Sequence, residues 1–227
     1  MTTDMARIIG IIGGTGKEGK GLAYRWAKVG YTVYIGSRQE EKAILAAEEV
    51  NNLLGTPGTV KGLANAEAAS KSEIVVLTVP FAAHVDMCQV IKPFVQGKIL
   101  IDVTVPLVPP RVSRVQMPPE GSATQQAQSI LGSDVQVVAA FQNISYEHLL
   151  NDEDVHCDVL VCGGTKEARE VVLDLVSKIG LVGWNAGPAE NAVVVEGLTS
   201  VLIGLNKQFG VHSSGIRLTG LPRPDEG

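Results

Sequence analysis

The chain has 227 residues, with 19 Lys and Arg against 24 Asp and Glu, which gives a formal net charge of −5 at pH 7. This charge argues against general binding to nucleic acid or to an anionic membrane. A hydrophobic content of 45% with 19% charged residues indicates extensive burial, and the apolar stretch 192–205, interrupted by Glu196, is too short to span a membrane. Residues 1–7 lack the order of a signal peptide, so we expect a cytoplasmic protein.

A glycine-rich stretch is the most informative motif near the start of the chain. It lies between a β-branched run at 8–12, which predicts a strand, and the segment 22–27, whose apolar residues recur at helical spacing. In the pattern GxGxxG, Gly14 permits a tight turn, Gly16 lets the backbone approach a pyrophosphate, and Gly19 lets the helix pack closely on the strand. The order of strand, glycines and helix favours nucleotide binding over a glycine-rich turn without a ligand.

We expect the second strand over 32–35. In dinucleotide-binding domains the residues at the end of this strand discriminate between NAD and NADP. An NAD-binding domain usually has Asp or Glu at this place, about twenty residues after the glycines. Here Ser37 and Arg38 follow Gly36 instead, and Lys42 lies one helical turn further on. A hydroxyl, a guanidinium and an ammonium group suit a 2′-phosphate, so NADP(H) is favoured. The alternative is a charged helix start, in which the two cations pair only with neighbouring glutamates.

Strand-like and helix-like runs alternate along the rest of the chain. This alternation is typical of βα units and predicts a Rossmann-type, doubly wound α/β fold with a mostly parallel sheet. The expected elements are helices over 64–70, 81–95, 166–179 and 191–209, and strands over 73–79, 98–103, 135–141, 159–162 and 182–185, with a proline-rich connection at 106–119.

The helix expected over 191–209 is apolar nearly all round, as its residues Val193, Val194, Val201 and Leu205 illustrate. Such a helix is buried inside a fold or against another subunit. We therefore expect a homodimer that uses this helix.

Ligands of open α/β sheets bind beyond the carboxyl ends of the strands. The segments 15–19, 79–81 and 141–145 therefore converge on one crevice, where Asn143 and Ser145 supply polar groups. No acid–base pair is evident there. His84 is the nearby candidate, and a histidine with satisfied hydrogen bonds or one facing solvent is the favoured interpretation. The cysteines Cys88, Cys157 and Cys162 have no metal-type spacing, so we expect no metal site and take them as small core residues.

Several of these motifs recur together in one known family. In chain order they are Gly13-Gly14-Thr15-Gly16, Gly36-Ser37-Arg38 with Glu41-Lys42, Leu77-Thr78-Val79-Pro80-Phe81, Val161-Cys162-Gly163, and Ala186-Gly187-Pro188 leading to Glu196 and Leu198-Thr199. With this ordered set the chain resembles the NADP-dependent oxidoreductases of coenzyme F420 over most of its length. The resemblance implies reversible hydride exchange between NADP(H) and the 8-hydroxy-5-deazaflavin F420, a homodimer, an NADP-binding domain at 1–142 and a smaller C-terminal α/β domain at 143–227.

The resemblance also implies roles for individual residues. Hydride passes directly between the two rings and a proton can come from water, so no catalytic residue is assigned. The loop from Asn143 to Tyr146 would lie between the two cofactors, and Phe81 and Val85 would flank the nicotinamide half. The expected cofactor-contact residues are Gly14, Thr15, Gly16, Lys17, Glu18, Ser37, Arg38, Lys42, Val79, Pro80, Phe81, Val85, Asn143, Ser145 and Tyr146; Arg111, Arg114 or Arg217 could meet the anionic tail of F420.

Two positions depart from the family pattern, and two other functions stay open. Gln142 stands where some relatives have His, and Ser145 where some have Pro. The first alternative is an NADPH-dependent reductase of another acceptor, such as an imine, a ketone, a flavin or ferric iron, with His84 or Tyr146 as proton donor. The second is a non-catalytic NADP(H)-sensing protein whose C-terminal helix docks a partner.

Overall fold

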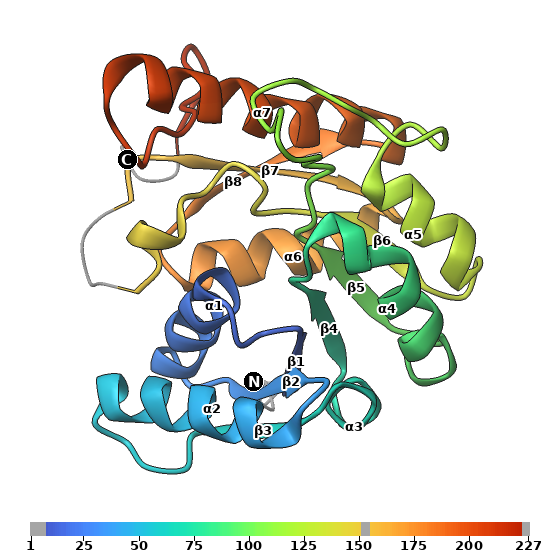
Figure 1. The fold of residues 1–227 in the computed structure, drawn as a ribbon, viewed down its shortest axis with the longest axis vertical. Helices are drawn as coiled ribbons and strands as arrows, with labels where there is room; N and C mark the ends of the chain where they lie inside the picture. The colour runs from blue at the N-terminus through green and yellow to red at the C-terminus, as the bar shows by residue number, and fades with distance from the viewer. Residues whose placement is uncertain (1–7, 151–154, 224–227) are drawn as a thin grey trace.

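The structure, a computed structural model, describes residues 8–150 and 155–223, whose strands form an eight-stranded sheet (Figure 1). The strand order is β3-β2-β1-β4-β5-β6-β7-β8, parallel throughout except that β7 pairs antiparallel with β6. The predicted α/β fold with a mostly parallel sheet is thus confirmed. The strands are β1 (Ile8–Ile12), β2 (Thr32–Ser37), β3 (Val60–Ala64), β4 (Ile74–Leu77), β5 (Ile99–Asp102), β6 (Gln136–Ala139), β7 (Asp158–Gly163) and β8 (Val182–Gly187).

Helices cover both faces of the sheet, as the two main apolar clusters show. One cluster joins the strands to α1, α2 and α6, and the other joins them to α3, α4 and α5. Strands buried on both faces read as continuous apolar runs, which is why the segments at 8–12 and 74–77 lack alternation. The helices are α1 (Lys17–Lys28), α2 (Glu40–Leu54), α3 (Asn65–Lys71), α4 (His84–Ile91), α5 (Ala123–Leu131), α6 (Lys166–Lys178) and α7 (Ala192–Phe209), with short 3₁₀ turns η1 (Phe81–Ala83), η2 (Lys92–Phe94), η3 (Tyr146–His148) and η4 (Ala189–Asn191).

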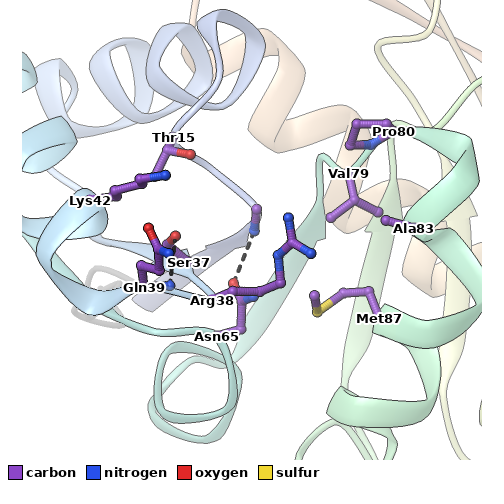
Figure 2. A pocket seen from close by; sticks show the side chains of 11 residues that line it. Thr15, Ser37, Arg38, Gln39, Lys42, Asn65, Val79, Pro80, Ala83 and Met87 are labelled. Carbon is purple, nitrogen blue, oxygen red and sulfur yellow. Dashed lines mark hydrogen bonds between the residues drawn. The ribbon is translucent and has the colours of Figure 1, made fainter.

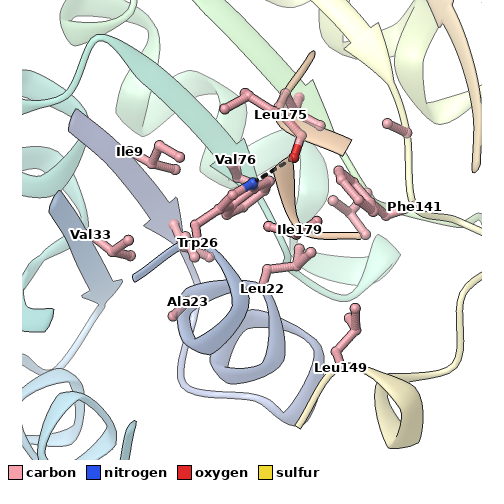
Figure 3. Packing of buried hydrophobic residues seen from close by; sticks show 14 of the residues in the cluster. Ile9, Leu22, Ala23, Trp26, Val33, Val76, Phe141, Leu149, Leu175 and Ile179 are labelled. Carbon is pink, nitrogen blue, oxygen red and sulfur yellow. Dashed lines mark hydrogen bonds between the residues drawn. The ribbon is translucent and has the colours of Figure 1, made fainter. Parts of the chain in front are cut away.

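Trp26 of α1 joins the N-terminal part of the core to the C-terminal part (Figure 3). Its indole Nε1 donates a hydrogen bond to the carbonyl of Leu175 in α6 at 3.2 Å, and its ring meets Phe141 edge to face with centroids 5.7 Å apart. The strands β7 and β8 also extend the same sheet as β1–β6. The two sequence regions therefore share one core, and a domain boundary between 142 and 143 stays a prediction.

Some elements differ from the sequence-based expectation. The segment expected as one helix over 81–95 is the 3₁₀ turn η1, the helix α4 and the 3₁₀ turn η2. The strand β3 and the helix α5 were not predicted at all. β3 (Val60–Ala64) contains Lys61 and Gly62, and α5 (Ala123–Leu131) is largely Ala and Gln, so neither has the apolar contrast on which a periodicity argument depends.

The helix α7 buries one side and exposes the other. Val195 and Leu202 are buried, whereas Val194 is 66% exposed and Phe209 is 68% exposed. Its inner face packs on α5 and β7 at the top of Figure 1. We expected this helix to be buried all round. Within this chain, only its inner face is buried.

Candidate functional site

The strand order reverses between β1 and β4, because the chain first builds β2 and β3 on one side of β1 and then returns to the other. Such a switch point opens a crevice at the carboxyl ends of the strands. A cleft of about 560 Å³ lies there (Figure 2). The residues that line this nucleotide cleft are Gly13, Thr15, Ser37, Arg38, Gln39, Lys42, Asn65, Val79, Pro80, Ala83 and Met87.

The glycine-rich turn is held by neighbouring strands and is open toward the cleft. Gly13 has φ +70° and donates its N–H to Asn65 Oδ1 at 3.1 Å, while the N–H of Gly14 bonds to the carbonyl of Gly36 at 3.0 Å. A Cβ on Gly19 would stand 2.5 Å from the Gly14 Cα, so this position needs glycine for packing. A Cβ on Gly16 would meet no atom within 4 Å. The chain itself leaves that space open, as close approach of a pyrophosphate requires.

The end of β2 supplies the cationic part of the cleft. Ser37, Arg38 and Lys42 all line it, and Figure 2 shows the Arg38 guanidinium reaching from β2 toward Val79. Within the described ranges, Arg38 and Lys42 form no ion pair, so neither charge is taken up by a glutamate of α2. Their charges are available to a phosphate, which favours the NADP interpretation over a charged helix start.

Sequence reasoning missed Asn65, Gln39, Ala83 and Met87 in this cleft. Asn65 opens α3 and is buried, and its amide oxygen fixes Gly13 across a sequence separation of 52 residues. A lone Asn at a predicted helix start gives no sign of that contact. Phe81 is not among the lining residues and stacks on His84, with 6.1 Å between ring centroids.

A second cavity, of about 360 Å³, is lined by four more of the expected site residues, Glu18, Asn143, Ser145 and Tyr146. The segment 15–18 borders both cavities, because Thr15 lines the nucleotide cleft and Glu18 lines the second cavity. Lys17 Nζ lies 3.3 Å from the Tyr146 hydroxyl and 4.6 Å from the centre of its ring, which ties α1 to the loop after β6. The residues that line this cavity are Glu18, Val103, Val105, Leu107, Phe141, Gln142, Asn143, Ile144, Ser145, Tyr146, Thr199, Leu202, Ile203, Asn206, His212 and Ser214.

Three lining residues of this cavity hold a buried oxygen without a hydrogen-bond partner among the described residues: Glu18 Oε1, Gln142 Oε1 and Asn143 Oδ1. Gln142 uses its NH₂ group to bond the Asp102 carbonyl at 2.7 Å, and Asn143 uses its own to bond the Val195 carbonyl at 2.9 Å. These hydrogen bonds fix the orientation of both amide groups, and each amide oxygen is left without a hydrogen-bond donor among the described residues. Unpaired buried oxygens are costly, and their clustering marks a place where a ligand with polar hydrogens fits.

His84 belongs to the interior and lies outside both cavity linings. It is fully buried, with Nε2 2.8 Å from Asp102 Oδ2 and Nδ1 3.2 Å from Gln126 Oε1. Burial lowers the pKa of His84, but hydrogen bonds with Asp102 and Cys88 outweigh it and raise the pKa to about 11. The interpretation of His84 as a histidine with satisfied hydrogen bonds is confirmed.

The arginines suggested for the anionic tail of F420 lie on the surface. Arg111, Arg114 and Arg217 are exposed and are not among the residues that line the second cavity. Val85, expected beside the nicotinamide, is 38% exposed and does not line the nucleotide cleft. In the described ranges, no helix combines the length and apolar character that crossing a membrane needs.

Three features define the class of protein: the strand order reverses beside the glycine turn, the turn is open, and cationic side chains lie where a 2′-phosphate would bind. The chain is an NADP-binding protein of the Rossmann type. Residues 8–106 match the family described as NADP oxidoreductase, coenzyme F420-dependent.

Full-length relatives narrow the class to a family. The chain is 38% identical to an F420-dependent NADP reductase of Methanocaldococcus jannaschii, across 94% of this chain and 98% of the relative. It is 41% identical to one of Methanothermobacter thermautotrophicus, across 97% and 98%. The crystal structure of a putative F420-dependent NADP reductase from Arthrobacter sp. FB24 superposes with a TM-score of 0.78 at 25% identity, covering 94% of this chain and 99% of that one. The chain belongs to the F420-dependent NADP reductase family, which confirms the resemblance found in the sequence.

Proposed function

We propose that this protein catalyses reversible hydride transfer between NADP(H) and the deazaflavin coenzyme F420. The observation that carries the proposal is the pair of cavities on the two sides of the glycine turn. One has cationic groups for a phosphorylated ribose, and the other has apolar walls with unpaired polar oxygens. Two ring systems that must exchange a hydride need such adjoining sites. Relatives that match nearly the whole chain are named F420-dependent NADP reductase, which supports the proposal.

The nucleotide cleft fits NADP(H). The pyrophosphate would lie over Gly16, where the backbone leaves open space at the start of α1, and the helix N-terminus would favour its negative charge. The 2′-phosphate would meet Ser37, Arg38 and Lys42. Val79 and Pro80 would support the dinucleotide from the end of β4. When bound, NADPH supplies the hydride, and the protein supplies position.

The second cavity fits the deazaflavin ring. Val103, Leu107 and Leu202 give it apolar surface, and Asn143, Ser145 and Tyr146 give it polar groups from the loop after β6. Since the hydride passes directly from one ring to the other, the chain accelerates the reaction by holding the rings at reactive distance and by keeping water out.

The test is a spectrophotometric assay of the purified protein with NADPH and oxidised F420, followed by the loss of deazaflavin absorbance. NADH and FMN serve as parallel substitutes, and an imine, a ketone and ferric iron serve as alternative acceptors. Turnover confined to NADPH and F420 supports the proposal. Turnover with another acceptor in place of F420 would contradict it, and NADPH binding without any turnover, with a change of oligomeric state, would indicate a sensor.

The proposal includes a homodimer formed through α7. Val194, Val201, Leu205 and Phe209 are 66%, 48%, 40% and 68% exposed, and their spacing places them along one side of the helix. Light scattering should give the mass of a dimer for the wild-type protein and the mass of a monomer for Val201→Glu. A monomeric wild-type protein would contradict the proposed homodimer. A cytoplasmic location is also proposed, supported by three cysteines that all remain free thiols.

A further inference from the structure

Glu18 stands at an unusual place for a carboxyl group. It lies in the first turn of α1, within the glycine motif, next to the expected path of a dianionic pyrophosphate. A carboxylate there would repel the phosphates. The structure instead places Glu18 on the wall of the second cavity, together with Asn143 and Tyr146. Glu18 thus lines the cavity that fits the deazaflavin, and it is not among the residues that line the nucleotide cleft with Ser37, Arg38 and Lys42.

The surroundings of Glu18 favour the neutral acid. Its Oε1 is buried, and no described residue donates a hydrogen bond to it. Burial raises the pKa of Glu18 to about 8. Lys17 is turned to the Tyr146 ring, and Lys20 is paired with Glu49. The charged and titratable groups on α1, on the elements α2, β2 and η3 that pack against it, and in the second cavity are Lys17, Lys20, Tyr24, Arg25, Lys28, Tyr34, Glu40, Glu41, Lys42, Glu48, Glu49, Tyr146, Glu147, His148 and His212.

The chemistry of the proposed reaction needs one proton for each hydride. NADPH becomes NADP⁺ by losing a hydride from C4, and oxidised F420 gains that hydride at C5 and a proton at a ring nitrogen. A general acid is most effective when its pKa lies near the working pH. Among the side chains that line the second cavity, Glu18 is a carboxyl group that meets this condition.

We propose that Glu18 is the proton donor of the reaction: its carboxylic acid gives a proton to the ring nitrogen of F420 while the hydride bond forms at C5 and the C4–H bond of NADPH breaks. The carboxylate that results takes a proton from water. In the opposite direction the same carboxylate removes the proton from reduced F420 as its hydride passes to NADP⁺. This inference rests on the proposed function and assigns a catalytic residue to it.

The decisive experiment compares wild type with Glu18→Gln in single-turnover reactions in both directions across pH. In the wild type, F420 reduction should slow as the pH rises through about 8, and oxidation of reduced F420 should quicken over the same range. Glu18→Gln should lose both pH-dependent limbs and be about 100-fold slower or more, which is the usual contribution of a general acid. NADPH affinity, measured by fluorescence titration, should be unchanged. The matched control is Glu170→Gln, an exposed glutamate of α6.

The outcomes separate the two proposals. Wild-type turnover with an unaltered rate and pH profile in Glu18→Gln would overturn the role of Glu18 and leave the proposed function intact. Absence of turnover in the wild type would overturn the proposed function, and with it proton donation to F420. Infrared difference spectra supply a readout without turnover: a carboxylic acid band that is lost near pH 8 in wild type and absent from Glu18→Gln supports the inference, and ionisation in the usual range for Glu contradicts it.

Discussion

The carboxylate of Glu196, in α7, accepts hydrogen bonds from both the backbone N–H and the hydroxyl of Thr124, in α5, at 3.0 and 2.8 Å. The N–H of Ala123 adds a third at 2.7 Å, so a side chain of one helix caps the N-terminus of another. The N-cap residue Ser122 accepts the N–H of Gln125, and Glu196, which lies 72 residues beyond Thr124, accepts the two N–H groups before it. The contact fixes α7 against the parallel part of the fold and so helps position Leu202 and Thr199 in the second cavity.

Glu196→Gln should destabilise the protein, because the amide NH₂ cannot accept one set of these bonds and leaves a buried donor unsatisfied, at a cost of about 1–3 kcal/mol. Burial and the neighbouring charge of Asp102 raise the pKa of Glu196 from 4.5 to about 7, against the effect of its three donors. A raised pKa in the folded state means that this group stabilises most below pH 4.5 and progressively less as the pH rises to 7.

Urea unfolding of wild type and Glu196→Gln at a series of pH values tests this. The difference in free energy of unfolding should be largest at acidic pH and shrink toward pH 7. A difference that grows with pH would contradict the assignment. Glu190→Gln, in the exposed turn before α7, is the control.

Gly16→Ala and Gly19→Ala should separate binding from packing within one motif. The Cβ that Gly16→Ala adds would enter open space and leave stability unchanged, but it would occupy the approach to the pyrophosphate and weaken NADPH binding about tenfold or more. The Cβ that Gly19→Ala adds would lie 2.5 Å from the Gly14 Cα and destabilise the fold by about 1–3 kcal/mol. Thermal unfolding and NADPH titration measure both effects, and a stability loss in Gly16→Ala would show that the open space has a structural purpose.

Arg38→Ala should weaken NADPH binding and leave NADH binding nearly unchanged. A hydrogen bond to a charged group contributes about 1.5–3 kcal/mol, which corresponds to about 10- to 150-fold in affinity. Fluorescence titration with the two nucleotides gives the ratio directly. Lys61→Ala, an exposed cation of β3, controls for the loss of positive charge. An equal loss for NADPH and NADH would mean that Arg38 does not contact the 2′-phosphate.

His84→Ala should unfold more easily but keep its turnover per folded molecule. Removing one partner of a buried ion pair leaves Asp102 uncompensated, at a cost of about 3–5 kcal/mol. The pKa of His84 is raised from 6.5 to about 11 in the folded protein, so its stabilisation is complete below pH 6.5 and is lost as the pH rises toward 11. Wild type should therefore lose stability over that alkaline range more steeply than the variant.

Denaturant unfolding together with the F420 assay provides the test, and Asp86→Ala, exposed on the same helix, is the control. A large loss of turnover at full folding would revive His84 as a proton donor and contradict its structural role.

Local patterns were sufficient for much of the nucleotide cleft. The glycine turn, Ser37, Arg38 and Lys42 follow one another within about one βαβ unit, so short spacing alone brought them together. Val79 and Pro80 could be added because parallel strands end at the same edge of a sheet. Asn65 could not, since its hydrogen bond to Gly13 depends on how α3 packs under the turn.

The sequence by itself determined the mostly parallel α/β class, the NADP preference and the family, because each depends on residue types at short, regular spacings. Tertiary structure alone decided the second cavity, whose walls come from α1, the segments after β5 and β6, α7 and the segment after α7. Phe141, in the wall of this cavity, illustrates why. It is buried and has φ +73°, a backbone conformation that the residues beside it in the sequence do not predict. In this conformation its ring packs edge to face on Trp26, which is far away in the sequence. The same holds for Glu18 in the wall of this cavity. Its burial and its lack of a hydrogen-bond donor depend on contacts between segments that are distant in the sequence, so the sequence near Glu18 does not predict them.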